Sequence, residues 1–201
     1  MTDQLDPTRT VVLVMDYQRS IVDAVAERSG HPAPVDAAAR AVATARAAGA
    51  LVGHVRVALT DDEAAAAPAH SVFGRAVAAR PAGSMHPDHP GAAFDPRVAP
   101  EPGDVVVRKS RVGAFSTTDL DARLRAAGVT TVVLAGLSTS GVVLTTVREA
   151  ADRDFRVVVF GDACADPRAD VHDVLLSTVF PSQALVTTTD RLPGLLGAAH
   201  R

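Results

Sequence analysis

The chain carries a carboxylate and an amine that each close a short apolar run. Asp16 ends the run Thr10-Val-Val-Leu-Val-Met, and Lys109 ends the run Asp104-Val-Val-Val-Arg. If the two groups meet, each favours the charged form of the other, and the pair can serve acid–base chemistry. Solvated charges also stand at strand ends, so position alone leaves that alternative open.

A turn of small residues is the third feature that could take part in chemistry. In Ala135-Gly-Leu-Ser-Thr-Ser-Gly-Val-Val-Leu-Thr-Thr146 a strand-like run passes through glycine and hydroxyl residues directly into a helix-like run. Such a turn can aim backbone N–H groups at an anion or an oxyanion. Many α/β proteins have a glycine and an N-capping Ser or Thr there for structural reasons, so the turn alone does not establish a site.

Six runs rich in β-branched residues predict the strands that position these groups. They cover residues 10–16, 50–57, 104–109, 130–136, 155–160 and 183–187. Alanine-rich helical segments lie between them, over residues 35–48, 119–127, 139–152 and 169–180. The alternation predicts an α/β fold, a doubly wound (Rossmann-like), mostly parallel six-stranded sheet with helices on both faces. Ligands of such a sheet lie at the carboxyl ends of its strands.

Local signals mark some of these boundaries. Thr118 is expected to cap the helix that follows it, Gly128 to end that helix, and Gly49 to end the helix before it. Residues 60–102 lack clear periodicity and are rich in Ala, Pro, Gly and His. A connection of that length predicts a lid, an oligomer contact or a mobile loop, with a short helix within residues 69–79.

Composition limits the classes of function. The 201 residues, 47% hydrophobic and 21% charged, predict a single domain over residues 1–201. A net charge of −3 without blocks of like charge argues against a nucleic-acid or anionic-membrane partner. The sequence shows no secretory signal and no apolar run of the roughly 20 residues that span a bilayer. With Cys164 as the single cysteine, a cytoplasmic location is expected.

In this order and spacing, the three segments resemble the isochorismatase-like hydrolases, a family that includes nicotinamidases, N-carbamoylsarcosine amidases and isochorismatases. The resemblance spans nearly the whole chain. The family's strand ending Asp-x-Gln is matched by residues 16–18, and its Lys, small-residue loop, Phe and Thr-capped helix by Lys109, Phe115 and Thr118. Its Gly-x-x-Thr-x-x-Cys-Val motif is matched by residues 136–143, except at the cysteine.

The resemblance implies roles for the matched residues. Asp16 becomes the general acid/base and Lys109 its electrostatic partner. The residues implied to bind substrate are Gln18, Ile21, Phe115, Ser138, Gly141 and Val142. The resemblance further implies a cis peptide bond between Leu137 and Ser138, a small-molecule substrate, no cofactor, and a homodimer or larger homo-oligomer.

Position 142 departs from the amidases of the family. Val142 stands where they carry the nucleophilic cysteine, and valine cannot form an acyl intermediate. The family's isochorismatases also lack this cysteine, carry the smaller glycine, and use the acid, which fits protonation of an enol ether followed by attack of water. The prediction is a hydrolase that uses Asp16 and Lys109 on an enol ether or C–N bond of a small polar molecule. The alternative is a catalytically silent member that binds a small molecule or serves assembly.

Other candidate groups have simpler interpretations. Cys164 lies on a different loop and is expected to be a small buried hydrophobe, while N-capping explains the hydroxyls of residues 138–140. No metal is expected, because residues 61–63 lack the Asp-x-His of metal-binding nicotinamidases. Solvated or turn positions are expected for His70, His86 and His89. A true isochorismatase would need a basic rim, for which the candidates are Arg75, Arg108 and Arg111.

Overall fold

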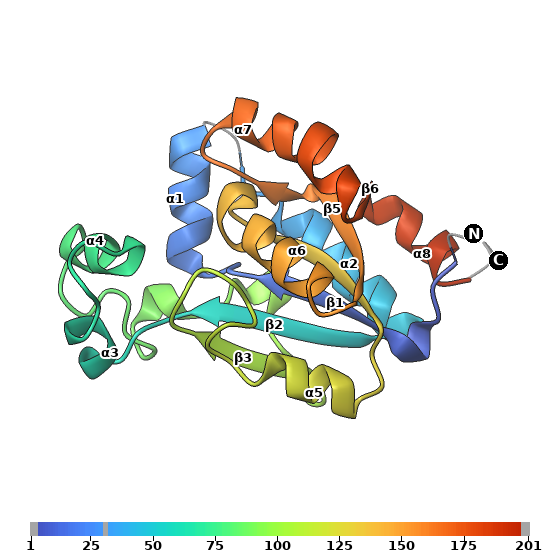
Figure 1. Cartoon of the computed structure of the whole chain (residues 1–201), viewed down its shortest axis with the longest axis horizontal. Coiled ribbons are helices and arrows are strands. Elements are labelled where there is room, and N and C mark those ends of the chain that lie inside the picture. The colour runs from blue at the N-terminus through green and yellow to red at the C-terminus, as the bar shows by residue number, and fades with distance from the viewer. Residues whose placement is uncertain (1–3, 30–31, 198–201) are drawn as a thin grey trace.

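Six parallel strands form the centre of the molecule, in the order β3-β2-β1-β4-β5-β6 (Figure 1). The structure is a computed structural model that describes residues 4–29 and 32–197. The strands are β1 (Thr10–Met15), β2 (Leu51–Val57), β3 (Val105–Lys109), β4 (Thr131–Leu137), β5 (Arg156–Ala165) and β6 (Leu185–Thr187). This topology confirms the predicted doubly wound α/β fold, with its switch point between β1 and β4.

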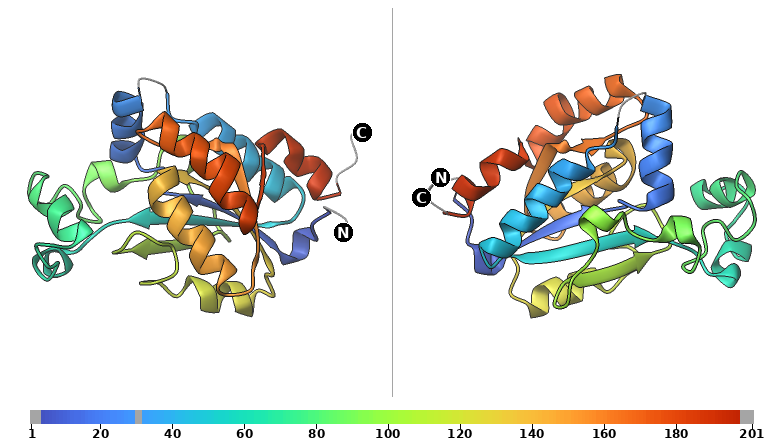
Figure 2. Two further views of the ribbon diagram at one scale, coloured as in Figure 1. Left: turned by 45° about the horizontal axis from the view of Figure 1, so that its top comes forward. Right: turned by 180° about the vertical axis from the view of Figure 1, so that it is seen from behind.

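Helices cover both faces of this sheet (Figure 2). On one face the core includes residues of α1 (Arg19–Ser29), α2 (Val35–Ala47) and α8 (Leu192–Leu195). The other face packs against α5 (Leu120–Ala126), α6 (Leu144–Ala151) and the segment that continues α7 (Ala169–Val174). Strand β1 supplies both cores, since Val12 and Val14 face the first and Leu13 and Met15 the second. Burial on both faces explains its unbroken apolar sequence.

Several boundaries differ from the prediction. Strand β5 runs five residues past the expected end at Phe160, after a register shift opposite β4. The helix expected from residue 139 begins with a π-helical turn, Thr139–Val143, before α6. The helix expected from Asp119 starts at Leu120, although the Thr118 hydroxyl still accepts a hydrogen bond from the Leu120 N–H, at 3.2 Å.

Helix α1 was not predicted. Its eleven residues bury only Val25 completely, so the sequence carries a weak apolar stripe. The helix follows Gln18 directly, where the Gln18 carbonyl accepts hydrogen bonds from Ile21 and Val22. No helix within the described ranges combines the length and apolarity needed to cross a bilayer.

The weakly patterned segment 60–102 is ordered by local capping. Thr60 forms a capping box with Glu63 at the start of α3 (Asp61–Ala65), and the Ser71 hydroxyl caps α4 (Val72–Ala78). These helices form a lobe that projects beyond the carboxyl ends of β2 and β3 (Figures 1 and 2). The short helix expected within residues 69–79 is therefore present.

Gly136→Ala is expected to lower the free energy of unfolding by about 1–3 kcal/mol through overpacking. A Cβ atom at Gly136 would lie 3.0 Å from a Val143 methyl group and 3.2 Å from the Met15 carbonyl oxygen. The matched control is Gly194→Ala in α8, where a Cβ meets nothing within 4 Å. Urea denaturation should show the control unchanged or stabilised by about 0.4–1 kcal/mol, and equal effects of both changes would contradict this packing account.

Candidate active site

A buried ion pair joins the ends of β1 and β3. Asp16 Oδ2 lies 2.9 Å from Lys109 Nζ, and the two side chains are 7% and 2% exposed. The sequence predicts neighbouring strand ends, but β2 lies between the two strands. The side chains therefore meet across the end of β2. Lys109 Nζ also donates a hydrogen bond to the Arg111 carbonyl, at 3.2 Å.

Asp16 leaves β1 in a left-handed backbone conformation, with φ of 62°. Such a conformation costs a non-glycine residue of order 1–3 kcal/mol and persists where the surroundings impose it. The Asp16 N–H still donates to the Val55 carbonyl at 2.8 Å, so the residue remains attached to β2 while the chain turns. The turn thus belongs to the architecture that carries the ion pair.

The ion pair with Lys109 involves only one of the two oxygen atoms of the Asp16 carboxylate. Asp16 Oδ1 is buried and has no hydrogen-bond partner among the described residues. Burial raises the pKa of Asp16 above its ordinary value, and the charge of Lys109 opposes this rise only in part. The site can therefore hold a proton on Asp16 more readily than an exposed carboxyl group does.

This raised pKa predicts a pH-dependent difference between the wild type and Asp16→Asn. Between the ordinary pKa of 3.8 and the raised value, the folded wild type binds more protons than the unfolded chain. Its free energy of unfolding therefore falls as pH rises through that window. The variant lacks this titration, so urea denaturation from about pH 4 to about pH 7 should show its stability rising relative to wild type. A relative stability that falls with rising pH would show that Lys109 lowers the pKa instead.

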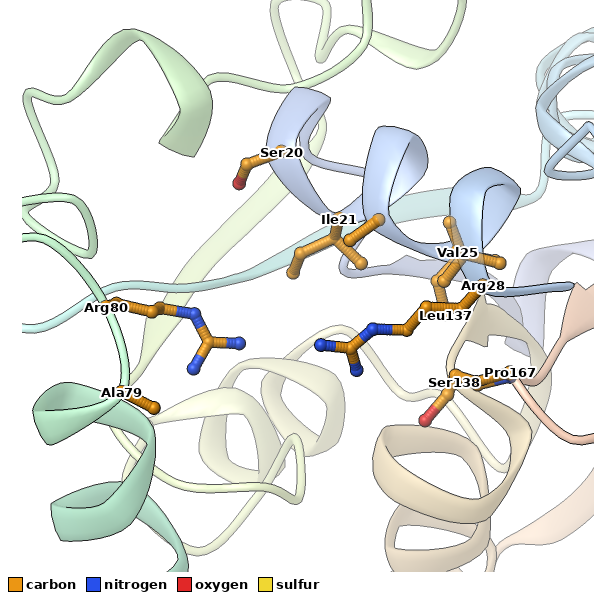
Figure 3. A pocket seen from close by; sticks show the side chains of 10 residues that line it. Ser20, Ile21, Val25, Arg28, Ala79, Arg80, Leu137, Ser138 and Pro167 are labelled. Carbon is orange, nitrogen blue, oxygen red and sulfur yellow. The ribbon is translucent and has the colours of Figure 1, made fainter.

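One cavity opens beside the ion pair, and a second cavity shares part of its wall. The first, of 180 Å³, is lined by Asp16, Lys109, Gly141 and Val142 together with Phe73 and Met85 of segment 60–102. The second, of 390 Å³, lies between α1 and the residues that follow α4 (Figure 3). Leu137, Ser138 and Arg80 line both cavities. The expected cis peptide bond between Leu137 and Ser138 is present at this shared wall.

The structure brings most of the predicted residues to these cavities. Ile21 lines the larger cavity, and Ser138, Gly141 and Val142 line the smaller one. Their proximity follows from the switch point of the sheet, where the ends of β1 and β4 lie side by side.

Gln18 and Phe115 have other surroundings. The Gln18 amide is buried and bonds both backbone groups of Val57, at 2.7 Å and 2.9 Å, and the Ala92 carbonyl, at 3.2 Å. Phe115 is buried against Phe155, with ring centroids 5.9 Å apart. Neither side chain lines the two cavities beside the ion pair. Their contacts instead stabilise the framework around the site.

The turn after β4 uses several of its own polar groups. The Ser140 N–H donates to Asp166 Oδ2 at 2.7 Å, and the Gly141 N–H donates to the Ser138 carbonyl at 3.2 Å. The Thr139 hydroxyl lies 2.8 Å from His172 Nδ1. The Ser140 N–H is therefore bound to Asp166, which follows β5, and the Gly141 N–H is bound within the turn, so neither group is free to bind a ligand.

Two arginines in the larger cavity were missed by the sequence analysis. Arg28 lies on the unpredicted helix α1, and Arg80 follows α4 (Figure 3). The sequence signal for Arg28 was its spacing from Ile21, two helical turns away and so on one face of the helix, whereas Arg80 has no such local signal. The arginines named as a possible rim have other contacts, since Arg108 pairs with Glu63 at 2.7 Å and the remaining two bond backbone carbonyls.

The thiol of Cys164, the single cysteine of the chain, has a raised pKa. Cys164 is 4% exposed, and burial raises the pKa of its thiol to about 12. It does not line either cavity beside the ion pair. Within residues 4–29 and 32–197, no three His, Cys, Asp or Glu side chains are grouped to hold a metal ion. The charged side chains that line the two cavities are Asp16, Lys109, Arg28 and Arg80.

Comparison with known proteins places this geometry in context. Residues 10–191 match the sequence profile of the isochorismatase domain. The chain is 37% identical to maleamate amidohydrolase of Pseudomonas putida over 150 residues, which cover 73% of this chain and 67% of that protein.

Solved structures share the whole fold. An isochorismatase family protein of Burkholderia thailandensis superposes with a TM-score of 0.80 at 30% identity, covering 96% of this chain and 98% of that one. A cysteine hydrolase of Pseudomonas syringae gives a TM-score of 0.84 at 25% identity, covering 98% and 96% of the two chains.

Proposed function

The chain belongs to the isochorismatase family, and from that membership we propose that it hydrolyses a small polar molecule by acid–base chemistry of Asp16 and Lys109. The observation that carries the proposal is the buried ion pair beside a cavity, in which Asp16 Oδ1 has no hydrogen-bond partner in the part of the chain that the structure describes. In this proposal Val142 occupies the place of the amidases' cysteine, and no acyl-enzyme forms. The bond cleaved is a C–N bond or an enol ether.

For a C–N bond, water is the nucleophile. Asp16 accepts a proton from the water as its oxygen attacks the carbonyl carbon, and the proton then passes to the departing nitrogen as the C–N bond breaks. Lys109, 2.9 Å away, stabilises the ionised carboxylate before and after the transfer. The products are a carboxylic acid and an amine, and Asp16 returns to its starting state.

For an enol ether, Asp16 starts in its protonated form. It donates a proton to the terminal carbon of the double bond, and water adds to the resulting oxocarbenium carbon. The hemiketal then collapses to a ketone and an alcohol, with a proton returned to Asp16. The raised pKa of Asp16 favours this use of the carboxyl group as an acid.

A substrate screen tests the proposal and its rival, a silent binding module. Amides, carbamates and enol ethers should be offered in parallel to the wild type and to Asp16→Asn. Cleavage by the wild type that is lost in the variant supports the hydrolase. Valine at position 142, where the amidases carry their cysteine, favours the rival. The rival predicts that the wild type and Asp16→Asn both bind a small molecule saturably and that neither cleaves a substrate of any class.

We further propose that the chain forms a homodimer or larger homo-oligomer. Val72 on the projecting lobe is 59% exposed, and Val106 on the edge strand β3 is 39% exposed. A sheet edge and an exposed apolar side chain are both surfaces that association covers. Light scattering at micromolar concentration should give at least twice the 20.7 kDa mass of one chain; a mass near that of one chain would contradict the proposal.

A further inference from the structure

Two guanidinium groups face each other across the larger cavity. Figure 3 shows Arg28 reaching in from α1 and Arg80 from the opposite wall, with Ile21 and Ser138 bordering the space between them. The two residues belong to segments about fifty positions apart in the sequence. Their approach is therefore produced by the tertiary fold and not by local sequence.

Among the described residues, no carboxylate forms an ion pair with either guanidinium group. The Arg80 guanidinium donates a hydrogen bond to the Ala76 carbonyl, at 3.0 Å. The ten residues that line the cavity include no carboxylate. In the adjoining cavity the charges of Asp16 and Lys109 offset each other. Arg28 and Arg80, which are both exposed to solvent, therefore give the lining of the two cavities a net positive charge.

Building on the proposed hydrolase function, we infer that the substrates are carboxylates, held by Arg28 and Arg80. A guanidinium fork matches the two oxygens of a carboxylate and binds them with charge-assisted hydrogen bonds. An anion between the two arginines also relieves the repulsion between them. The 390 Å³ volume accommodates a small organic acid.

The shared wall fixes how such a substrate lies. Arg80 and Ser138 line both cavities, so a carboxylate at the arginines places the rest of the molecule past Ser138 toward Asp16 and Lys109. The side chains of Ile21 and Leu137 give the connecting carbon atoms an apolar surface. Carboxylate recognition and bond cleavage thus occupy the two ends of one continuous site.

Calorimetric titration with three four-carbon probes tests the inference without requiring turnover. Succinate, succinamate and succinamide share one skeleton and carry two, one and no carboxylate groups. Succinate and succinamate should bind, and succinamide should bind at least tenfold more weakly than succinamate. Arg28→Gln and Arg80→Gln should each weaken succinamate binding roughly 10- to 100-fold, the range for a hydrogen bond to a charged group. The matched control is Arg19→Gln on α1, which is exposed like Arg28 and Arg80 but lies outside the cavity, and it should leave binding unchanged.

Two further arms separate this inference from the proposed function. Asp16→Asn should retain the charge preference even if no substrate is ever cleaved, so failed turnover with intact, arginine-dependent binding would overturn the hydrolase alone. Equal binding of all three probes, or equal effects of Arg19→Gln and Arg80→Gln, would overturn the carboxylate inference. Inorganic phosphate that binds as tightly as succinate would also overturn it, by showing a general anion site. Circular dichroism spectra should verify that each variant is folded.

Discussion

Asp16→Asn is expected to reduce the turnover of a cleaved amide or enol ether by roughly 10²–10⁴-fold, the usual effect of removing a positioned general acid or base. The amide has nearly the shape of the carboxyl group, so the backbone turn at position 16 should persist. What disappears is the group that accepts or donates the proton beside Lys109. Steady-state kinetics of both proteins measure the loss, and it should appear in kcat.

The matched control for this change is Cys164→Ser. Because the thiol has a pKa of about 12, only about one part in 10⁴ is thiolate at pH 8, and it is both buried and outside the cavities. Activity should survive this substitution and prior treatment with iodoacetamide. If alkylation abolished activity and Cys164→Ser reproduced the loss in a folded protein, Cys164 would be the nucleophile and the acid–base proposal would be wrong.

Lys109→Met should lower the free energy of unfolding by about 3–5 kcal/mol, because it leaves the buried Asp16 carboxylate without its countercharge. Methionine retains most of the length of the lysine stem, so packing changes little. Urea denaturation at about pH 7, where the unpaired carboxylate is most costly, gives the clearest measurement. The activity of Lys109→Met should fall as well, since Lys109 stabilises the ionised state of Asp16 in the proposed cycle.

The double variant Asp16→Asn/Lys109→Met separates charge from packing. Removing both charges should recover much of the stability lost by Lys109→Met, because an ion pair and a neutral pair of similar volume often have similar stability. Activity should not return. Stability equal to the sum of the two single changes would mean that the two groups do not interact energetically, contrary to their 2.9 Å separation.

Sequence patterns were most informative where burial is complete. Every residue of β1 is buried, so its composition predicted the strand and placed Asp16 at its end. The expected sheet places ligands at the carboxyl ends of its strands, and Ser138 and Val142 after β4 line one cavity together with Asp16 after β1. Such features follow from periodicity and topology, which the linear sequence expresses directly.

The missed features depend on contacts that no local pattern records. Helix α1 has one completely buried residue, so its periodicity was too weak to predict it, and Arg28 was overlooked with it. Arg80 lies beyond α4 in a segment organised by the caps Thr60 and Ser71, and only the tertiary fold directs it toward α1. Similarly, nothing local to Gln18 shows that its amide bonds Val57 and Ala92.

The returning end of segment 60–102 is attached to the core by hydrogen bonds of its own, apart from the projecting lobe. The Gln18 amide and backbone bonds from residues 17–19 to residues 93–95 hold the returning chain against the start of α1. Insertions or deletions within the projecting lobe are therefore expected to leave the backbone of β1 and β3 in place, since exposed connections tolerate changes in length. Arg80 lies inside this replaceable stretch. Exchanging the lobe would replace Arg80, Phe73 and Met85 in the walls of the cavities, whereas Asp16 and Lys109 belong to the ends of β1 and β3.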